Sequence, residues 1–398
     1  MWARYSERTW RIESMHKTQV IIIGAGPSGL LLALLLRRHG IDCLVLERQE
    51  RRHVEGRLRA GLLESQSVDL IREAGVGARM QAEGLTHEGF FLAFDNHTHR
   101  IDLAGLTGRT VCVYGQSELQ RDLGDAIGDE VVWSATDVTI ESMSGPVRVS
   151  YSVEGLRQTV EGDFLAGCDG YHGISRASVP MGHLTEFHQA LPATWLGVLA
   201  DSAPVRPELV YAHHARGFAL CSMRSPQRAR LYLECGSDAT AEQWSDARFW
   251  DELRRRLPDE MGNAVVPGPI IEKSVIALRS FVAEPMRFER LFLVGDAAHV
   301  VPPTGAKGLN LAASDVRLLW EALTDYYRSG STRALDVYSD RALQRVWRAT
   351  RFSWWMTRLL HRLDGSDYAL RLQSAELAAI ACSQAASTAM AESYAGIF

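Results

Sequence analysis

The sequence lacks any pair of cysteines at metal-ligand spacing, and it lacks an excess of basic charge. Its six cysteines are scattered along 398 residues without a CxxC pair, which predicts free, mostly buried thiols, a reducing cytoplasmic environment and no metal site. The net charge of −5 argues against a nucleic-acid partner. Repeats and low-complexity segments are absent too. With 46% hydrophobic residues, the chain predicts a globular fold with an ample core.

A long uninterrupted hydrophobic segment is also missing. Residues 20–36 carry no charge, but a Gly-Pro-Ser-Gly turn divides this run, which favours a short strand and a helix over a membrane span. Residues 1–14 are polar and basic and have no apolar core of a secretion signal. We therefore expect no membrane association, and we expect residues 1–14 to be a dispensable extension before a natural start at Met15.

The stretch from Gln19 to Glu47 reads as strand, turn, helix and strand. Glycines of the turn allow a sharp bend, a close approach of backbone N–H groups to a pyrophosphate, and tight packing of helix on strand. These glycines are Gly24, Gly26 and Gly29. Glu47 ends the second strand, where its carboxylate can accept hydrogen bonds from both ribose hydroxyls and would repel a 2′-phosphate. This pattern predicts a bound FAD or NAD.

Two later stretches leave their role open. The charged run Arg48–Arg52 leads to Arg57 and Arg59, which fit either a solvated loop or contacts to phosphate. A hairpin pairs residues 217–223 with residues 228–234, and alternation places Ser222 and Arg224 opposite Arg230 and Tyr232 on one polar face. That face fits either solvent exposure or the floor of a carboxylate pocket.

The remaining pattern completes a mixed α/β prediction. Asp296 ends a buried-type strand before a Pro/Gly turn and a helix over 307–327, which gives a second edge facing a ligand. Residues 62–74 and 116–127 also read as helices. The C-terminal part, 334–391, is helical, and its aromatic cluster of Phe352, Trp354 and Trp355 is typical of a core or subunit interface.

Three motifs carry a family resemblance. GAGPSG with Glu47, AGCDGYHGISR at 166–176 and FLVGDAAHVVPPTGAKGLN at 292–310 resemble the flavin motifs of the single-component FAD-dependent aromatic hydroxylases. Further segments, including YGQSEL at 114–119, RGFALCSMRS at 216–225 and RFSWWMT at 351–357, are similar to the members that act on 4-hydroxybenzoate. The resemblance extends from about Met15 to Gly396.

The resemblance implies a Rossmann-like FAD-binding fold with an inserted antiparallel-sheet substrate domain and a C-terminal helical region. The predicted division is 1–14 for the extension, 15–185 and 286–330 for the FAD-binding domain, 186–285 for the substrate domain and 331–398 for the helical region. The predicted cofactor-binding residues are Gly24, Gly26, Ser28, Gly29, Glu47, Arg57, Leu58, Arg59, Ala60, Gly61, Leu62, Gln116, Asp169, Asp296, Leu309 and Asn310.

The resemblance further implies hydroxylation of 4-hydroxybenzoate ortho to its phenol, using O2 and NADPH or NADH through a flavin C4a-hydroperoxide, in a cytoplasmic homodimer. The implied substrate contacts are Tyr211, Ser222, Arg224, Tyr232 and Pro303, with Tyr394 and His87 continuing a proton path. The pattern departs at His53, where the family commonly has tyrosine, and at Leu191–Trp195. The alternatives are the same chemistry on another hydroxy- or aminobenzoate, and a flavin-binding redox sensor without turnover.

Overall fold

A six-stranded, mainly parallel sheet is assembled from segments far apart in the sequence. The computed structural model describes residues 16–56 and 61–397. Across the sheet the strands are β19 (Arg287–Phe288), β20 (Leu291–Leu293), β13 (Phe164–Gly167), β2 (Val20–Ile23), β3 (Cys43–Leu46) and β9 (Val131–Val132). Only β19 and β20 pair antiparallel. Val20–Ile23 is buried along its whole length, as expected of an apolar, β-branched strand in a covered parallel sheet.

Helices cover this sheet. The longer ones here are α1 (Pro27–Arg38), α3 (Ser65–Glu73), α6 (Gln116–Ile127) and α10 (Gly308–Ser329). Helix α1 packs against α6 and α10, and every residue of α1 from Gly29 to Leu36 is buried, because the segment is apolar on all sides. A four-stranded sheet lies alongside, in the order β1 (His16–Lys17), β12 (Leu156–Gly162), β11 (Val147–Val153) and β10 (Thr136–Ser142).

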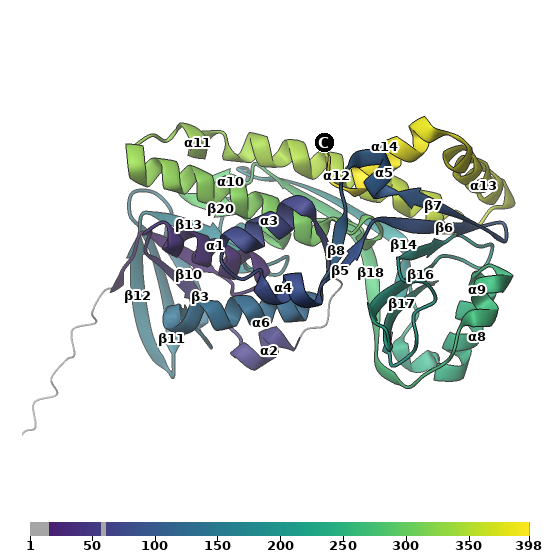
Figure 1. The fold of residues 1–398 in the computed structure, drawn as a ribbon. Coiled ribbons are helices and arrows are strands. Elements are labelled where there is room, and N and C mark those ends of the chain that lie inside the picture. The colour runs from purple at the N-terminus through teal and green to yellow at the C-terminus, as the bar shows by residue number, and fades with distance from the viewer. Residues whose placement is uncertain (1–15, 57–60, 398) are drawn as a thin grey trace, which may run out of the picture.

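An eight-stranded sheet forms the other half of the molecule (Figure 1). Its order is β21 (His299–Val300), β18 (Ile270–Glu284), β14 (Thr185–Ala200), β17 (Arg228–Cys235), β16 (Ala219–Ser225), β15 (Val210–Ala212), β6 (Gly89–Phe94) and β7 (His97–Asp102). Most of its neighbours are antiparallel, and β15 with β6 is parallel. The sheet therefore includes β6 and β7, which lie before the predicted substrate segment.

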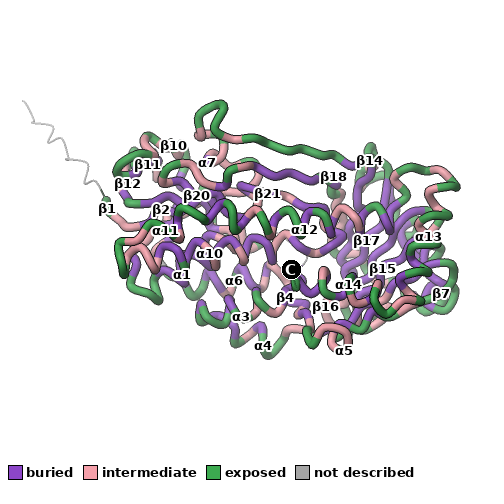
Figure 2. Tube along the Cα trace, turned by 90° about the horizontal axis from the view of Figure 1, so that it is seen from above, coloured by how far each residue is buried: buried purple, intermediate pink, exposed green. Residues whose placement is uncertain are grey.

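The two faces of the eight-stranded sheet have different neighbours. Cys221, Leu231 and Leu233 pack on α8 (Asp246–Arg256), in one apolar cluster with Phe249 and Leu253. Tyr211, Leu220 and Tyr232 belong to a second cluster that also contains residues of the C-terminal helices. The alternation predicted for the hairpin is therefore present. Figure 2 shows β14 passing from an exposed start to a buried end.

The C-terminal region is helical, as predicted, and after the short helix α11 (Arg333–Asp336) it forms three longer helices with breaks between them. They are α12 (Tyr338–Leu360), α13 (Asp367–Cys382) and α14 (Gln384–Tyr394). Helices α10 and α12 run along the top of the molecule in Figure 1, and α13 and α14 lie above the eight-stranded sheet. In the part of the chain that the structure describes, no helix is long and apolar enough to cross a membrane.

Short elements connect these layers. They are the helices α2 (Arg51–Glu55), α4 (Ala78–Glu83), α5 (Leu103–Thr107), α7 (Ile174–Ala177), α9 (Asp259–Ala264) and α11 (Arg333–Asp336), and four 3₁₀ turns, Gly128–Glu130, Ala241–Gln243, Gly295–Ala297 and Pro303–Gly305. A three-stranded sheet has the order β4 (Leu62–Glu64), β8 (Val111–Val113) and β5 (Leu85–His87). The helix predicted from Leu62 therefore starts at Ser65, because Leu62–Glu64 pairs with β8 instead.

Candidate active site

The loop between β2 and α1 requires glycine where the motif has it. Gly24 has φ +104°, and a Cβ there would lie 2.4 Å from the carbonyl oxygen of Cys168. A Cβ on Gly29 would lie 1.9 Å from the carbonyl oxygen of Gly24. At Gly26, in contrast, a Cβ would meet no described atom within 4 Å. The loop therefore offers open space beside bare backbone, which is what a pyrophosphate needs.

Glu47 lies just beyond β3 and stabilises this loop. Its Oε2 accepts a hydrogen bond from the N–H of Ala25 at 2.8 Å, and its Oε1 accepts one from Gln49 at 2.9 Å. Gln120 of α6, which no sequence pattern marks as a site residue, donates to the Ala25 carbonyl at 2.8 Å. An ionised carboxylate has about four lone-pair sites, so Glu47 keeps acceptor capacity for ribose hydroxyls.

The residues before α6 lie against Gly61. A Cβ on Gly61 would lie 1.7 Å from the carbonyl oxygen of Tyr114 and 2.7 Å from the backbone nitrogen of Gln116. The structure therefore brings Gly61 and Leu62, the first residue of β4, beside Gln116. The predicted cofactor residues Arg57, Leu58, Arg59 and Ala60 lie outside the described residues, so their role stays a prediction.

The turn after β20 carries Asp296. Gly295 adopts φ +61°, and a Cβ there would lie 3.0 Å from Ser28 Oγ and 3.1 Å from the Cβ of Ala312 on α10. The second predicted ligand edge therefore contacts the start of α1. Ser28 and Asp296, 268 positions apart in the sequence, are both partly exposed beside this turn.

The N-terminus of α10 lies next to this turn. Asn310 is buried, its Oδ1 accepts hydrogen bonds from Glu64 N–H and Ser67 Oγ at 2.8 Å, and its Nδ2 donates to the Leu62 carbonyl at 2.9 Å. Among the described residues, no side chain caps the first turn at Lys307. Backbone N–H groups at Gly308 and Leu309 and the positive end of the helix dipole therefore remain for an acceptor.

Asp169 has a different geometry from the other predicted cofactor residues. Its Oδ2 accepts hydrogen bonds from the N–H and the hydroxyl of Ser175, at 2.8 and 2.9 Å. Its Oδ1 is buried and has no hydrogen-bond partner among the described residues. Burial raises the pKa of this carboxyl above its usual value, while the Ser175 hydrogen bonds act to lower it. Asp169 fixes the turn that packs against Gly24.

The two predicted tyrosines meet. The hydroxyls of Tyr211 on β15 and Tyr394 on α14 are 2.9 Å apart, and each residue is 1% exposed. Phe90 stacks on the Tyr394 ring with centroids 4.3 Å apart. Burial raises the pKa of both phenols above the usual value, so both hydroxyls stay protonated near neutral pH. A pair of neutral hydroxyls can pass a proton because each donates and accepts.

Arg224 is a partly exposed cation that has no counter-ion among the described residues. Among the described residues the structure records no hydrogen bond or ion pair for it, and burial lowers the pKa of its guanidinium. Tyr232 acts to raise the pKa of Arg224 and Arg230 acts to lower it, and Ser222 is two residues before Arg224 on β16. A charge that is partly removed from water and unpaired is costly, so an anion bound at this face of the hairpin would stabilise Arg224.

Two further predicted residues lie around this face. Pro303 begins the 3₁₀ turn just before α10. His87 is 2% exposed, and neither of its ring nitrogens has a hydrogen-bond partner among the described residues. Burial lowers the pKa of His87, Glu208 acts to raise it and Arg224 acts to lower it. The structure therefore does not join His87 directly to Tyr394.

A buried ion pair that the sequence did not reveal supports Tyr394. Lys307 Nζ is 2.7 Å from Glu64 Oε1 and donates to the Tyr394 carbonyl at 2.7 Å. Arg345 of α12 contacts the other Glu64 oxygen at 2.8 Å. These contacts connect β4, the start of α10 and the end of α14. They fix the end of α14, which carries Tyr394, beside β4 and the start of α10.

An aromatic group missed by the sequence analysis packs behind Tyr232. Trp195 Nε1 donates to His361 Nε2 at 2.6 Å, and the Trp195 and Tyr232 ring centroids are 4.9 Å apart. Burial lowers the pKa of His361 to about 3, so its ring stays neutral and accepts this hydrogen bond. Only a contact between distant segments defines this group.

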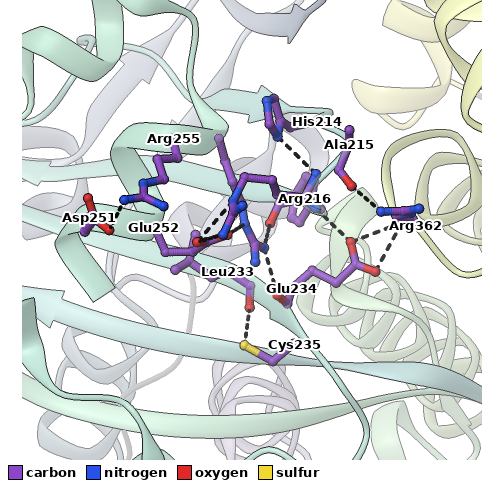
Figure 3. Close-up of polar contacts among 12 residues, drawn as sticks. His214, Ala215, Arg216, Leu233, Glu234, Cys235, Asp251, Glu252, Arg255 and Arg362 are labelled. Carbon is purple, nitrogen blue, oxygen red and sulfur yellow. Dashed lines mark hydrogen bonds and ion pairs between the residues drawn. The ribbon is translucent and has the colours of Figure 1, made fainter. Parts of the chain in front are cut away.

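A network of charged residues fixes the β16–β17 hairpin near the end of β17 (Figure 3). Glu234 of β17 accepts hydrogen bonds from the backbone N–H of Phe218 at 2.7 Å and of Arg362 at 3.1 Å. Arg256 of α8 donates to the carbonyls of Phe218 and Glu234 and pairs with Glu252. The network ties β17, which carries Tyr232, to α8 and to the end of α12.

Comparison with known proteins shows to which family this chain belongs. A family model described as an FAD binding domain matches residues 17–353. The p-hydroxybenzoate hydroxylase of Acinetobacter baylyi is 49% identical over 386 residues, which are 96% of each chain. This chain is an FAD-dependent aromatic hydroxylase.

More distant relatives of the hydroxylase share its fold. The 6-hydroxy-3-succinoylpyridine 3-monooxygenase of Pseudomonas putida is 28% identical and covers 81% of this chain and 83% of its own. The crystal structure of the p-nitrophenol 4-monooxygenase of Pseudomonas putida matches with a TM-score of 0.82 at 18% identity, over 96% of this chain and all (100%) of the other. The predicted mixed α/β class is confirmed. The alternative of a flavin-binding sensor without turnover is not supported.

The hydroxylase uses FAD as cofactor and NAD(P)H as co-substrate, and the described residues fit FAD. The space at Gly26 would receive the pyrophosphate, Glu47 the ribose and Asp296 the ribityl chain. The uncapped start of α10 would face the part of the ring system that becomes negative on reduction. This residue-level assignment is our proposal.

Replacing Asp296 by alanine is expected to weaken FAD binding by about ten- to a hundredfold, because a hydrogen bond to a charged group contributes about 1.5–3 kcal/mol. The measurement is the flavin released on dilution, followed by its fluorescence. Asp336→Ala, which removes an aspartate paired with Arg287 at the surface, is the matched control. Full flavin occupancy in Asp296→Ala would contradict the assignment.

Proposed function

We propose that this hydroxylase acts on 4-hydroxybenzoate and adds one oxygen atom ortho to the phenol, forming 3,4-dihydroxybenzoate. The observation that carries the proposal is Arg224, a partly exposed guanidinium that has no anionic partner among the described residues. A guanidinium matches a carboxylate with two parallel hydrogen bonds. The name of the Acinetobacter baylyi relative supports the same substrate.

The other residues of the face complete the binding site in this proposal. The hydroxyls of Ser222 and Tyr232 donate to the substrate carboxylate beside Arg224. Tyr232 lies opposite Leu220 in the β16–β17 register, and Ser222 lies opposite Arg230. The substrate ring would extend from this face toward the Tyr211 hydroxyl, with Pro303 at its edge. Neutral phenols lack the anion that Arg224 requires, so they should bind poorly.

The tyrosine pair would prepare the substrate for attack. Bound FAD, once reduced by NAD(P)H, would supply the chemistry that activates O2, and O2 would be the source of the oxygen atom. Tyr211 accepts a hydrogen bond from the substrate phenol, and its own proton passes to Tyr394, 2.9 Å away. Loss of the phenolic proton raises the electron density at the ortho carbon, which is the position attacked. His87, whose pKa is lowered by burial so that its neutral ring can accept a proton, is the proposed outlet toward solvent.

Substrate-dependent oxidation of NADPH, measured over a panel of benzoates, tests this proposal. We expect 4-hydroxybenzoate to stimulate oxidation most, with product formed in step with NADPH consumed. Dihydroxy- and aminobenzoates separate the alternative substrates, and phenol controls for the carboxylate. A higher kcat/KM and better coupling with an aminobenzoate would overturn the assignment of substrate, and the family assignment would stand.

NADPH is expected to be used more readily than NADH. Fewer arginines remain to bind the 2′-phosphate of NADPH, because Arg51 pairs with Glu55 at 2.6 Å and also contacts Asp125. Arg48 and Arg52 remain exposed and would attract a 2′-phosphate. We expect Arg52→Ala to raise the KM for NADPH and to leave that for NADH unchanged. Equal kcat/KM for both nucleotides in the parent enzyme would refute the preference.

The homodimer and the cytoplasmic location stay predictions. Light scattering on the purified protein measures the mass in solution directly. A mass of one chain across the working concentration range would refute the dimer.

A further inference from the structure

A buried ion pair lies beside the Gly295–Asp296 turn, and nothing above gives it a role. His299 Nε2 is 2.6 Å from Asp315 Oδ2, and each residue is 1% exposed. The same Oδ2 accepts a hydrogen bond from the Gly295 N–H at 2.9 Å. One carboxylate oxygen of α10 therefore contacts both ends of the segment 295–299, which contains Asp296.

This segment joins the two halves of the molecule. Before it, β20 belongs to the six-stranded sheet. After it, His299 lies opposite Val282 in the pairing of β21 with β18, in the eight-stranded sheet. The Ala298 carbonyl accepts a further hydrogen bond from Ala283 N–H at 2.8 Å. A shift of the pair would therefore move the Asp296 turn relative to both sheets.

The turn tolerates little movement on its other side. Ser28 Oγ of α1 and the Cβ of Ala312 on α10 lie 3.0 and 3.1 Å from where a Gly295 Cβ would be. The backbone there is left-handed, with φ +61°. The direction of the Gly295 N–H is therefore set by the loop, and Asp315 is the acceptor that matches it.

The Asp315 carboxylate favours the protonated form of His299. Burial acts to lower the pKa of His299, but the Asp315 carboxylate outweighs it, Asp296 adds to the effect, and the net shift of the pKa is upward. Buried ion pairs contribute little net stability compared with apolar packing, while removal of one partner leaves an uncompensated charge. The benefit of such a pair lies in fixing one arrangement of the groups around it.

We propose that His299 and Asp315 are positioning residues that hold the Gly295–Asp296 turn and the start of α10 in the arrangement that binds FAD. The proposal rests on the assignment of Asp296 and α10 to the flavin site. It requires no contact between the pair and the flavin. The pair acts through the turn and the helix.

Flavin release from the full-length holoenzyme tests the proposal, together with thermal unfolding of each variant. We expect His299→Leu to raise the Kd for FAD about tenfold or more, because it leaves Asp315 unpaired. His299→Gln can still donate a hydrogen bond to Asp315 and should recover most of the affinity. Asp315→Asn keeps an oxygen for the Gly295 N–H but removes the charge, and we expect an intermediate loss.

Tyr338→Phe is the matched control, because it deletes a buried hydrogen bond of 2.8 Å to the Leu293 carbonyl, two residues before the turn. It should lower Tm and leave the FAD affinity unchanged. Equal FAD affinity in His299→Leu and parent would overturn the proposal, as would a loss in Tyr338→Phe as large as in His299→Leu. Should His299→Leu not fold, unchanged affinity in Asp315→Asn overturns it instead.

The measurements distinguish a failure of the positioning role of His299 and Asp315 from a failure of the assignment of Asp296 to the flavin site. Unchanged FAD affinity in Asp296→Ala would remove the assigned ribityl contact, whatever the pair does. A loss in Asp296→Ala without a loss in His299→Leu would keep the site and reject the positioning role. The identity of the hydroxylated product bears on neither.

Discussion

Arg224→Lys is expected to raise the Kd for 4-hydroxybenzoate by about ten- to a hundredfold. Lysine keeps the positive charge, but it loses the planar fork that pairs with both carboxylate oxygens. The second hydrogen bond to a charged group contributes about 1.5–3 kcal/mol, which corresponds to this range. The change in flavin absorbance as substrate is added measures the Kd. The apparent affinity for FAD should stay that of the parent.

Arg228→Lys is the matched control for this variant. Arg228 begins β17 in the same hairpin, its side chain is 48% exposed and it pairs with Asp201 at the surface. It should leave the substrate Kd unchanged. An unchanged Kd in Arg224→Lys would show that the carboxylate binds elsewhere, and a panel on which phenol and 4-hydroxybenzoate bind equally would support that conclusion.

Tyr211→Phe and Tyr394→Phe are each expected to separate NADPH oxidation from hydroxylation. Oxygen transfer to the ring is an electrophilic substitution, and a phenolate is far more reactive than a phenol. A free phenol has a pKa of about 10 and is protonated at neutral pH. Without the hydroxyl pair, the bound substrate stays protonated and reacts slowly, so the activated oxygen is lost as hydrogen peroxide.

The ratio of hydroxylated product to NADPH consumed is the measurement for these variants. We expect it to fall severalfold in both, with a matching rise in hydrogen peroxide, while NADPH oxidation continues. Tyr327→Phe is the control, because Tyr327 bonds Gln19 and Asp163 at 3.1 and 3.0 Å, far from this pair in the fold. Near-complete coupling in Tyr211→Phe and Tyr394→Phe would exclude the relay.

Local patterns predicted much of the fold and part of the site. The glycine turn after β2 was predictable, because a sharp bend and an open backbone demand glycine at fixed positions. The faces of the β16–β17 hairpin followed from alternation, and the structure places Cys221 and Leu231 against α8 and Tyr232 on the other side. Helix α6 has the predicted bounds, Gln116–Ile127, because its apolar spacing and flanking glycines are local signals.

Contacts between distant segments could not be predicted in this way. Lys307 and Glu64 are 243 positions apart, and Trp195 and His361 are 166 apart. Neither pair has a local spacing that marks it. The start of α3 was misplaced for the same reason, since Leu62–Glu64 is a strand only because β8 lies beside it. The family resemblance gave roles to Tyr211 and Tyr394, while their 2.9 Å contact required the structure.

The most direct test of the account is one reaction run under oxygen labelled with a heavy isotope. Purified FAD-loaded protein is supplied with NADPH and 4-hydroxybenzoate. The products are separated by chromatography, and their masses are measured by mass spectrometry. We expect 3,4-dihydroxybenzoate carrying one labelled oxygen atom, in an amount close to the NADPH consumed. Hydroxylation at another position, an unlabelled product, or NADPH oxidation that yields only hydrogen peroxide would contradict it.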